Sequence, residues 1–293
     1  MRAYLPSYEL SVPRTLAEAL ALVRAEPGVW RPFAGGTDVM VLLEAGRLEH
    51  RKFFSIRHLS ELRGVAEADG VVRVGALTTY TDVRRSGLLS RLFPLLGQAA
   101  RETGGIAIQN RGTVGGNIAN ASPAADTPPA LLAYDAEVEL VSAAGARRVP
   151  YAEFHTGYKR TVMRDDELIA AVLLPKPREG TRHFYRKVGT RRAQAISKVC
   201  FAAVAEVEGE SLKEVRIALG SVAPVVLRCR RAEEALRGRR LDGEAVEAAA
   251  EEIGREVTPI DDVRSTARYR RRVAQNVLRE FLSGLRAGEG VRR

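Results

Sequence analysis

Two adjacent glycines, Gly115 and Gly116, lie within the run 112–136, GTVGGNIANASPAADTPPALLAYDA, among short hydrogen-bonding side chains. Glycines let the backbone turn sharply and approach a bulky ligand, and a cluster of backbone N–H groups in such a loop can hold a pyrophosphate. Asp126, the first acidic residue of the run, could hold a sugar hydroxyl. The same pattern also fits a glycine-rich turn before a buried helix, because two prolines lead into an apolar stretch.

A second diglycine loop occurs near the N-terminus, at 33–38, Phe-Ala-Gly-Gly-Thr-Asp. It follows the short apolar stretch 29–32 and precedes 39–43, so the pattern predicts a strand, a tight turn and the start of a helix. Neither loop fits the G-x-G-x-x-G pattern of dinucleotide-binding folds, or the P-loop, which needs a lysine after its last glycine. Two diglycine loops, each with a threonine beside it, indicate one long phosphate-bearing ligand held from both sides.

Patterns typical of other chemistry do not occur in the sequence. There is no G-x-S-x-G nucleophile elbow, no Cys–His arrangement and no spaced carboxylate pair, so we expect no catalytic residue. The only cysteines, Cys200 and Cys229, are far apart, whereas an iron–sulfur cluster needs about four thiolates. The 4 histidines show no metal-ligand spacing, so we expect no metal in this chain. Any redox chemistry must then depend on an organic cofactor.

The elements that would position the first loop can be predicted from hydrophobic spacing. Thr15-Leu16-Ala17-Glu18 has the form of a capping box and opens a helix that Pro27-Gly28 ends. Residues 29–34 and 53–56 have the composition of strands on either side of the first loop and its helix. The pattern predicts a β-α-β-α-β unit over roughly residues 1–57.

The second loop belongs to a region of mixed character. Residues 136–141 alternate polar and apolar side chains, turn at Ala144-Gly145 and return through 147–149, which predicts a hairpin. Residues 168–174 form a continuous apolar run that is typical of a buried strand. Before the loop, 92–100 has helical spacing. We therefore predict a second lobe that combines helices and strands.

The segment 175–180, Pro-Lys-Pro-Arg-Glu-Gly, is the predicted domain boundary, because prolines, charges and a glycine separate apolar runs. Beyond it, three antiparallel strands are predicted at 183–188, 197–208 and 212–219. Three helical patterns follow near 230–237, 243–255 and 265–285, with Ser265 as the N-cap of the last.

The predicted fold class is α+β. At 293 residues the chain is long enough for two domains. A two-lobed domain is expected over 1–176, with its lobes at about 1–57 and 58–176, followed by a C-terminal domain over 181–287. We expect the latter to be a three-stranded antiparallel sheet packed with helices.

The two loops resemble the FAD-binding loops of the flavoprotein, or medium, subunits of molybdenum hydroxylases. The matching motifs are GGTD at 35–38 and TVGGNIANASPAADTPPALLA at 113–133, and the second is long and specific. This family includes the carbon monoxide dehydrogenase medium subunit and the FAD domain of xanthine dehydrogenase. The resemblance extends over most of the chain and implies a two-lobed FAD-binding domain followed by a small sheet packed with helices.

The resemblance also implies which residues hold non-covalent FAD. Gly35 and Gly36 would admit the pyrophosphate, Asp126 would lie near the adenosine ribose, and Lys187 would bring positive charge near the flavin. A solvated strand lysine is the alternative for Lys187, and an ordinary core residue for Ile169. The implied set is Pro32, Phe33, Ala34, Gly35, Gly36, Thr37, Asp38, Val39, Thr103, Thr113, Val114, Gly115, Gly116, Asn117, Asp126, Ile169 and Lys187.

The resemblance implies an electron-transfer role within a larger complex. A molybdopterin-binding large subunit would oxidise the substrate, a [2Fe–2S] small subunit would relay electrons, and FAD in this chain would pass them to an external acceptor. A dimer of heterotrimers is the expected assembly. Two other functions stay open: a self-sufficient FAD-dependent oxidase or reductase of a related fold, and a basic scaffold or nucleic-acid module without enzymatic activity.

The formal net charge of +10 invites a nucleic-acid interpretation, but the basic residues are spread out and no aromatic residues interleave them. We therefore expect no nucleic-acid partner. Arg268, Arg270, Arg271 and Arg272 could face solvent or dock an acidic partner subunit. No early apolar run and no bilayer-spanning stretch occur, so a cytoplasmic protein without a transmembrane segment is expected.

Overall fold

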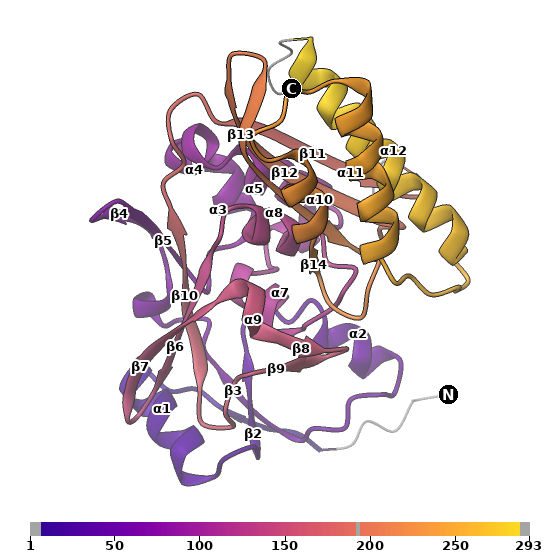
Figure 1. The fold of residues 1–293 in the computed structure, drawn as a ribbon. Helices are drawn as coiled ribbons and strands as arrows, with labels where there is room; N and C mark the ends of the chain where they lie inside the picture. Colours follow the sequence, from indigo (N-terminus) through magenta and orange to yellow (C-terminus); the bar gives the residue numbers. More distant parts are fainter. Residues whose placement is uncertain (1–6, 192–193, 288–293) are drawn as a thin grey trace.

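The computed structural model describes residues 7–191 and 194–287 of the chain. These residues form sheets of three, five and four strands and a separate two-stranded hairpin, with helices packed around them (Figure 1). The predicted α+β fold class is confirmed. Among the helices of the described part, none combines the length and apolar character that crossing a membrane requires.

The first lobe is a small parallel sheet with two connecting helices. Its elements are β1 (Glu9–Ser11), α1 (Leu16–Ala25), β2 (Trp30–Phe33), α2 (Val39–Glu44) and β3 (Lys52–Ser55). The strand order is β1-β3-β2, and both pairs are parallel. Thr15 caps α1 by accepting from the Glu18 backbone N–H at 3.1 Å, and the Glu18 carboxylate accepts from Arg14 rather than from Thr15. The predicted β-α-β-α-β order is present.

The second lobe is an antiparallel sheet in the order β4-β5-β10-β6-β7, surrounded by short helices. Its elements are η1 (Ser60–Leu62), β4 (Val65–Ala68), β5 (Val71–Gly75), α3 (Tyr80–Arg85), α4 (Gly87–Leu92), α5 (Pro94–Glu102), α6 (Ile106–Gln109), α7 (Val114–Ala119), α8 (Pro128–Ala133), β6 (Glu137–Ser142), β7 (Gly145–Pro150), α9 (Tyr151–Phe154), β8 (His155–Gly157), β9 (Arg160–Thr161) and β10 (Leu168–Pro175). The continuous apolar run becomes the central strand β10, which is buried on both faces except at its last residue.

The C-terminal part is an antiparallel sheet in the order β11-β12-β13-β14. Its elements are β11 (Arg182–Val188), β12 (Val199–Glu208), β13 (Ser211–Gly220), β14 (Leu227–Arg228), α10 (Arg230–Leu236), α11 (Gly243–Glu256) and α12 (Ala267–Arg286). The helices α10, α11 and α12 cover one face of this sheet, at the upper right of Figure 1. The three predicted strands are present, and β14 adds a fourth that is too short for a sequence pattern.

The N-cap of α12 differs from the prediction. Thr266 is the N-cap, and its hydroxyl accepts from the Tyr269 backbone N–H at 3.2 Å. The Ser265 prediction is wrong because the backbone of Ser265 closes a turn with Asp262 instead. Serine and threonine are both good caps, so their order in the sequence could not distinguish them.

Arg270 points inward, unlike its neighbours on α12. Its side chain is 4% exposed, and it donates to Asp262 at 2.7 Å and to the carbonyls of Ser221 and Lys198 at 2.9 and 3.1 Å. It therefore ties α12 to the C-terminal sheet, and it cannot belong to a docking surface as the arginine cluster in the sequence suggested.

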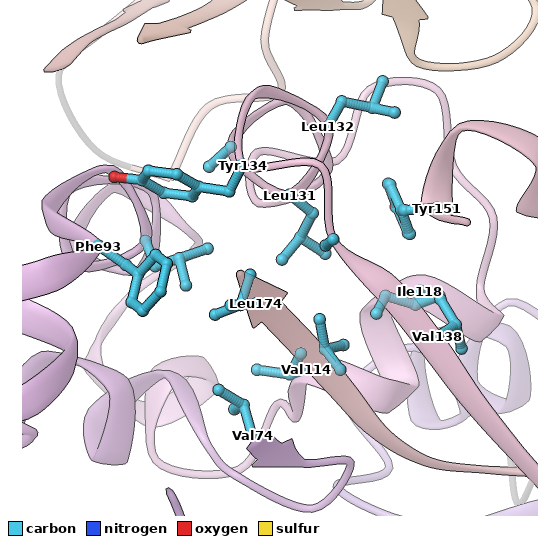
Figure 2. Packing of buried hydrophobic residues seen from close by; sticks show 14 of the residues in the cluster. Val74, Phe93, Val114, Ile118, Leu131, Leu132, Tyr134, Val138, Tyr151 and Leu174 are labelled. Atoms are coloured by element: carbon cyan, nitrogen blue, oxygen red, sulfur yellow. The ribbon is translucent and has the colours of Figure 1, made fainter. Parts of the chain in front are cut away.

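The largest hydrophobic core is shared by the two halves of the chain. Leu131, Tyr134 and Leu174 are packed inside it (Figure 2), and Ala202 and Val204 of β12 belong to the same cluster. The alternate residues of β12 face a second core beneath α10, α11 and α12. Strand β12 is thus buried on both faces, one against each half.

Candidate functional site

A cavity of about 690 Å³ lies where the first lobe meets the second. Both diglycine loops line it, together with residues of β2, α6 and the segment before β10. The predicted site residues in its lining are Pro32, Ala34, Gly35, Gly36, Thr37, Asp38, Val39, Thr103, Thr113, Gly115, Gly116, Asn117 and Ile169. The structure therefore brings two motifs that are far apart in the sequence to one concave site of the size that holds small ligands.

The two loops are braced directly against each other. A Cβ atom on Gly35 would overlap the Arg111 carbonyl oxygen at the start of the second loop. Gly36 has φ +75°, and a Cβ there would come within 2.6 Å of the Phe33 ring. Both positions therefore require glycine for reasons internal to the protein. The sequence suggested that Gly35 lets the backbone come close to a pyrophosphate. In the structure, Gly35 instead lies close to the backbone of Arg111.

The second loop is a short helix whose first N–H groups are already bonded. Thr113 is the N-cap of α7, and its Oγ1 accepts from the Gly116 N–H at 3.1 Å. The N–H groups of Val114 and Gly115 donate to the carbonyls of Thr78 and Ala76 at 3.0 and 2.8 Å. These groups are not available as a pyrophosphate cradle, which corrects the interpretation drawn from the sequence. The second loop forms a firm wall.

The first loop differs from the second in the availability of its backbone N–H groups. The backbone N–H groups of Gly35, Gly36, Thr37 and Asp38 have no hydrogen-bond partner among residues 7–191 and 194–287. Clustered free N–H groups are suited to bind phosphate oxygens. On the opposite wall, Oδ1 of Asn117 is buried and also lacks a partner in the described part of the chain. A buried acceptor of this kind normally has a donor, so the cavity offers unsatisfied donors and an acceptor to a polar ligand.

Four of the predicted site residues lie outside the cavity lining. Phe33 packs its ring on Gly36, and Val114 is 4% exposed in the large core. Asp126 and Lys187 form an ion pair of 2.7 Å whose side chains are 10% and 5% exposed. Their contact with a ligand remains a prediction.

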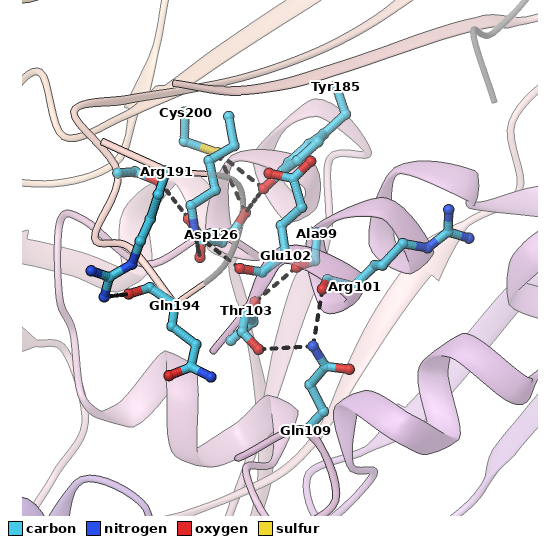
Figure 3. Close-up of polar contacts among 12 residues, drawn as sticks. Ala99, Arg101, Glu102, Thr103, Gln109, Asp126, Tyr185, Arg191, Gln194 and Cys200 are labelled. Atoms are coloured by element: carbon cyan, nitrogen blue, oxygen red, sulfur yellow. Dashed lines mark hydrogen bonds and ion pairs between the residues drawn. The ribbon is translucent and has the colours of Figure 1, made fainter. Parts of the chain in front are cut away.

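The ion pair of Asp126 and Lys187 is the centre of a buried polar network, in which Figure 3 labels Asp126. Ser197 donates to Oδ1 of Asp126 at 2.6 Å, and Nζ of Lys187 also donates to the Glu102 carbonyl at 2.9 Å. Burial raises the pKa of Asp126, while Lys187 and Ser197 act in the opposite direction. The network joins β11 of the C-terminal sheet to the residue that precedes Thr103 in the cavity wall.

Thr103 itself is held from the other side. Nε2 of Gln109 donates to the carbonyls of Arg101 and Thr103 at 2.9 and 3.2 Å (Figure 3). The Thr103 hydroxyl donates to the Ala99 carbonyl at 2.8 Å. The network around Lys187 and these bonds together position the end of α5 as one edge of the cavity.

Sequence reasoning missed several lining residues on the hairpin β8–β9 and on the segment that follows it. They carry no motif, and only the tertiary fold brings them to the cavity. Those with charged side chains are Lys159, Arg164, Asp165 and Glu167. Although burial raises the pKa of Glu167, its hydrogen bond with Arg147 and the backbone N–H of Arg164 hold that pKa below its usual range.

The described residues contain no cluster of three or more histidine, cysteine, aspartate or glutamate side chains that could hold a metal ion. Cys200 and Cys229 are both buried and free. Burial raises the pKa of each thiol, so neither is a ready thiolate ligand.

Family profiles cover nearly the whole chain. Residues 6–177 match the FAD binding domain in molybdopterin dehydrogenase, and residues 183–285 match the CO dehydrogenase flavoprotein C-terminal domain. The chain is 34% identical over 280 residues to the xanthine dehydrogenase FAD-binding subunit of Escherichia coli O157:H7, covering 94% of this chain and 95% of that protein. It is 30% identical over 278 residues to the carbon monoxide dehydrogenase medium chain of Hydrogenophaga pseudoflava, covering 95% and 96%.

The fold also matches a solved structure. It aligns with carbon monoxide dehydrogenase from Hydrogenophaga pseudoflava, in a form that lacks the Mo-pyranopterin moiety of the molybdenum cofactor, with a TM-score of 0.91 and 30% identity, over 94% of this chain and 96% of that one. Fold and site thus define an FAD-binding oxidoreductase subunit. The chain belongs to the family of FAD-binding medium subunits of molybdenum hydroxylases, which confirms the resemblance seen in the two loop motifs.

Proposed function

We propose that the cavity between the two loops is the FAD site and that it binds the cofactor without a covalent bond. The observation that carries the proposal is the row of N–H groups at residues 35–38 and, across one cavity, Oδ1 of Asn117, all without a hydrogen-bond partner in the described part of the chain. The N–H groups suit the diphosphate, and the amide oxygen suits a hydroxyl or N–H donor. The predicted residues that line the cavity would contact FAD, with Phe33 and Val114 supporting them from behind.

We further propose that this chain transfers electrons within a larger enzyme. Bound FAD would supply the redox chemistry, taking electrons from a [2Fe–2S] partner and passing them to an external acceptor. The chain's own residues would hold and orient the cofactor. Its buried cysteines and the lack of a metal-binding cluster among the described residues support placing the metal centres elsewhere.

The partners follow from the same argument. A molybdopterin-binding large subunit and a [2Fe–2S] small subunit would complete the enzyme, with a dimer of heterotrimers in the cytoplasm as the expected assembly. The name "medium chain" of the carbon monoxide dehydrogenase relative supports a multi-subunit complex. The division into domains at 1–176 and 181–287 is supported by family matches that end at 177 and begin at 183.

The cofactor site can be tested by contrasting the two glycines of α7. A Cβ on Gly116 would meet only Thr113 Oγ1 within 4 Å, at 2.8 Å, whereas a Cβ on Gly115 would lie 2.6 Å from the Ala76 Cβ. Gly116→Val should therefore weaken FAD binding while the apoprotein loses only about 1 kcal/mol through its helix cap. Gly115→Val should lower the melting temperature of the apoprotein. FAD titration and thermal unfolding of both variants measure this, and wild-type affinity in Gly116→Val would refute the site.

The electron-transfer role can be tested by anaerobic bleaching of the flavin. The isolated chain should release FAD on denaturation, yet purines, aldehydes, aromatic heterocycles and carbon monoxide should not bleach its flavin. Co-expression with the molybdenum and iron–sulfur subunits should give a complex in which the substrate does bleach it. If the isolated chain bleached fully and turned over, it would be a self-sufficient flavoenzyme and the subunit role would be wrong.

A further inference from the structure

A chain of polar contacts crosses the cavity and joins three separate segments. Nδ2 of Asn120, at the end of α7, donates to Oδ1 of Asp38 in the first loop at 3.2 Å. Nζ of Lys159, at the tip of the β8–β9 hairpin, donates to Oδ1 of the same Asn120 at 2.5 Å. All three residues line the cavity. We refer to Asp38, Asn120 and Lys159 as the latch.

The hairpin that carries Lys159 is a small independent element. Strands β8 and β9 pair only with each other among the described residues, and Lys159 has φ +57°, in the left-handed region that a tight turn requires. At its base, Nε2 of His155 is 3.0 Å from the Ile118 carbonyl of α7. The hairpin is therefore fixed to α7 at its base, and its tip reaches across through the Lys159 side chain.

The Asp38 carboxylate of the latch lies where the proposed site must also accept the negative charge of the diphosphate. Asp38 is the residue that ends the row of free N–H groups, and its carboxylate makes no cap bond to α2. A diphosphate on those N–H groups would lie beside that carboxylate and be repelled by it. Lys159 is joined to Asp38 through one amide side chain, so its ammonium offsets the repulsion. Of the other cations in the cavity lining, Arg31 donates from its Nε to His50 at 3.0 Å. Arg164 lies on the segment after the hairpin and is not part of the latch.

We propose that Lys159 is a charge-compensating residue for the diphosphate group of FAD, acting against Asp38 through the latch. The proposal rests on the proposed FAD site and adds a residue that neither loop motif contains. It specifies that Lys159 strengthens the binding of ligands that carry the diphosphate and not of ligands that lack it. It also specifies that this contribution depends on the Asp38 charge.

Three variants and three probes separate this role from a merely structural one. The variants are Lys159→Met, Asp38→Asn and the double variant, and Arg160→Met is the control because it removes the same charge from the neighbouring position of the hairpin. The probes are FAD, ADP and adenosine, of which only the first two carry a diphosphate. Affinities are measured by fluorescence quenching and calorimetry at low and high salt.

Lys159→Met should weaken FAD and ADP binding by about 10-fold or more, the range expected for loss of a charged interaction. Adenosine binding should not change, and high salt should reduce the difference between variant and wild type. Adding Asp38→Asn should restore most of the loss, because the repulsive carboxylate is then gone. Arg160→Met should bind all three probes as the wild type does. The dissociation of FAD from Lys159→Met should also be faster.

The outcomes distinguish the two proposals. If the wild-type protein bound no FAD, the cofactor site and the latch would both be rejected. If the wild type bound FAD and Lys159→Met bound it within twofold as tightly, only the latch would be rejected. The latch would also be overturned if Asp38→Asn failed to restore affinity, or if adenosine binding fell as much as ADP binding.

Discussion

At the scale of single residues, the buried pair of Lys187 and Asp126 is the contact whose role most needs separating into stability and ligand binding. The pair is nearly inaccessible to solvent, and each partner has a further hydrogen bond to a fixed group. A buried charge that loses its partner is strongly destabilising, whereas removing both charges costs much less. The resemblance seen in the sequence implies that these two residues contact FAD. In the structure they also join β11 to the second lobe, so we expect them to stabilise the fold.

We therefore expect Lys187→Met to lower the free energy of unfolding of the apoprotein by about 3–5 kcal/mol, as for one broken buried pair. The double variant with Asp126→Asn should recover a large part of this. Lys176→Met is the matched control, because its ion pair with Glu67 is 35% and 38% exposed and should contribute less than about 1 kcal/mol. Urea unfolding measures all three. Unchanged stability of Lys187→Met with lost FAD affinity would assign Lys187 to the cofactor alone.

At the scale of elements, His183 of β11 joins the C-terminal sheet to the second lobe. Its Nδ1 is 3.1 Å from the hydroxyl of Tyr134, which already accepts from the Leu95 backbone N–H at 3.2 Å. The hydroxyl proton is thus free to be donated to an unprotonated Nδ1. Burial, and secondarily the charge of Arg216, lower the pKa of His183 to about 4. At neutral pH the imidazole is therefore uncharged, and its Nδ1 can accept from the Tyr134 hydroxyl.

Burial of His183 makes a pH-dependent contribution to stability with a definite sign. The unfolded chain takes up a proton at His183 near pH 6.5, whereas the folded protein resists it until pH is about 4, so stability is lost as pH falls through this window. The full shift corresponds to roughly 3 kcal/mol. We expect His183→Gln to reduce the fall in melting temperature between pH 7 and pH 4.5. His58→Gln, at an exposed position, should leave the slope unchanged, and an unchanged slope in His183→Gln would contradict the assignment.

Long elements with strong periodicity were predictable from the sequence, whereas some of the short ones were not. The apolar run of β10 and the helices near 243–255 and 265–285 lie close to their predicted positions. The short elements α7 and β14 were missed, because a few residues show no period and their tertiary contacts decide their form. The diglycine motifs located both loops, but which loop keeps free N–H groups depends on contacts with Ala76 and Thr78.

The contacts of the latch could likewise not be predicted from the sequence. Asn120 is 82 positions from Asp38 and 39 from Lys159. No local pattern connects residues at such separations, so the contact between these three side chains could not be predicted from a single sequence. Lys159 in particular lies outside both motifs.

At the scale of the whole molecule, the shared core predicts that the two halves will not separate when the connection between them is cut. Ala202 and Val204 of β12 are buried with Leu131 and Leu174 of the second lobe, and Arg228 donates to the Leu132 carbonyl across the same boundary at 3.2 Å. Apolar area buried on this scale holds domains together without a covalent link. The segment between β10 and β11 is then a connection rather than a hinge.

The experiment is to insert a protease site between residues 177 and 180, cleave the folded protein and apply it to a size-exclusion column. We expect the nicked protein to elute as one species and to keep its FAD. Fragment 1–178 made alone should aggregate or unfold, since it lacks one wall of its core. Two separate peaks after cleavage would show that the halves are independent.

The direct contact of Gly35 with the Arg111 carbonyl has a consequence for how the protein acquires its cofactor. Because protein atoms brace the two walls, we expect the binding site to be formed before FAD binds. The heat capacity change on FAD binding should then match the surface covered by the ligand alone, without the larger signature of coupled folding. Association should also lack a slow isomerisation phase. Cofactor insertion would follow folding as a separate event, governed by the supply of FAD.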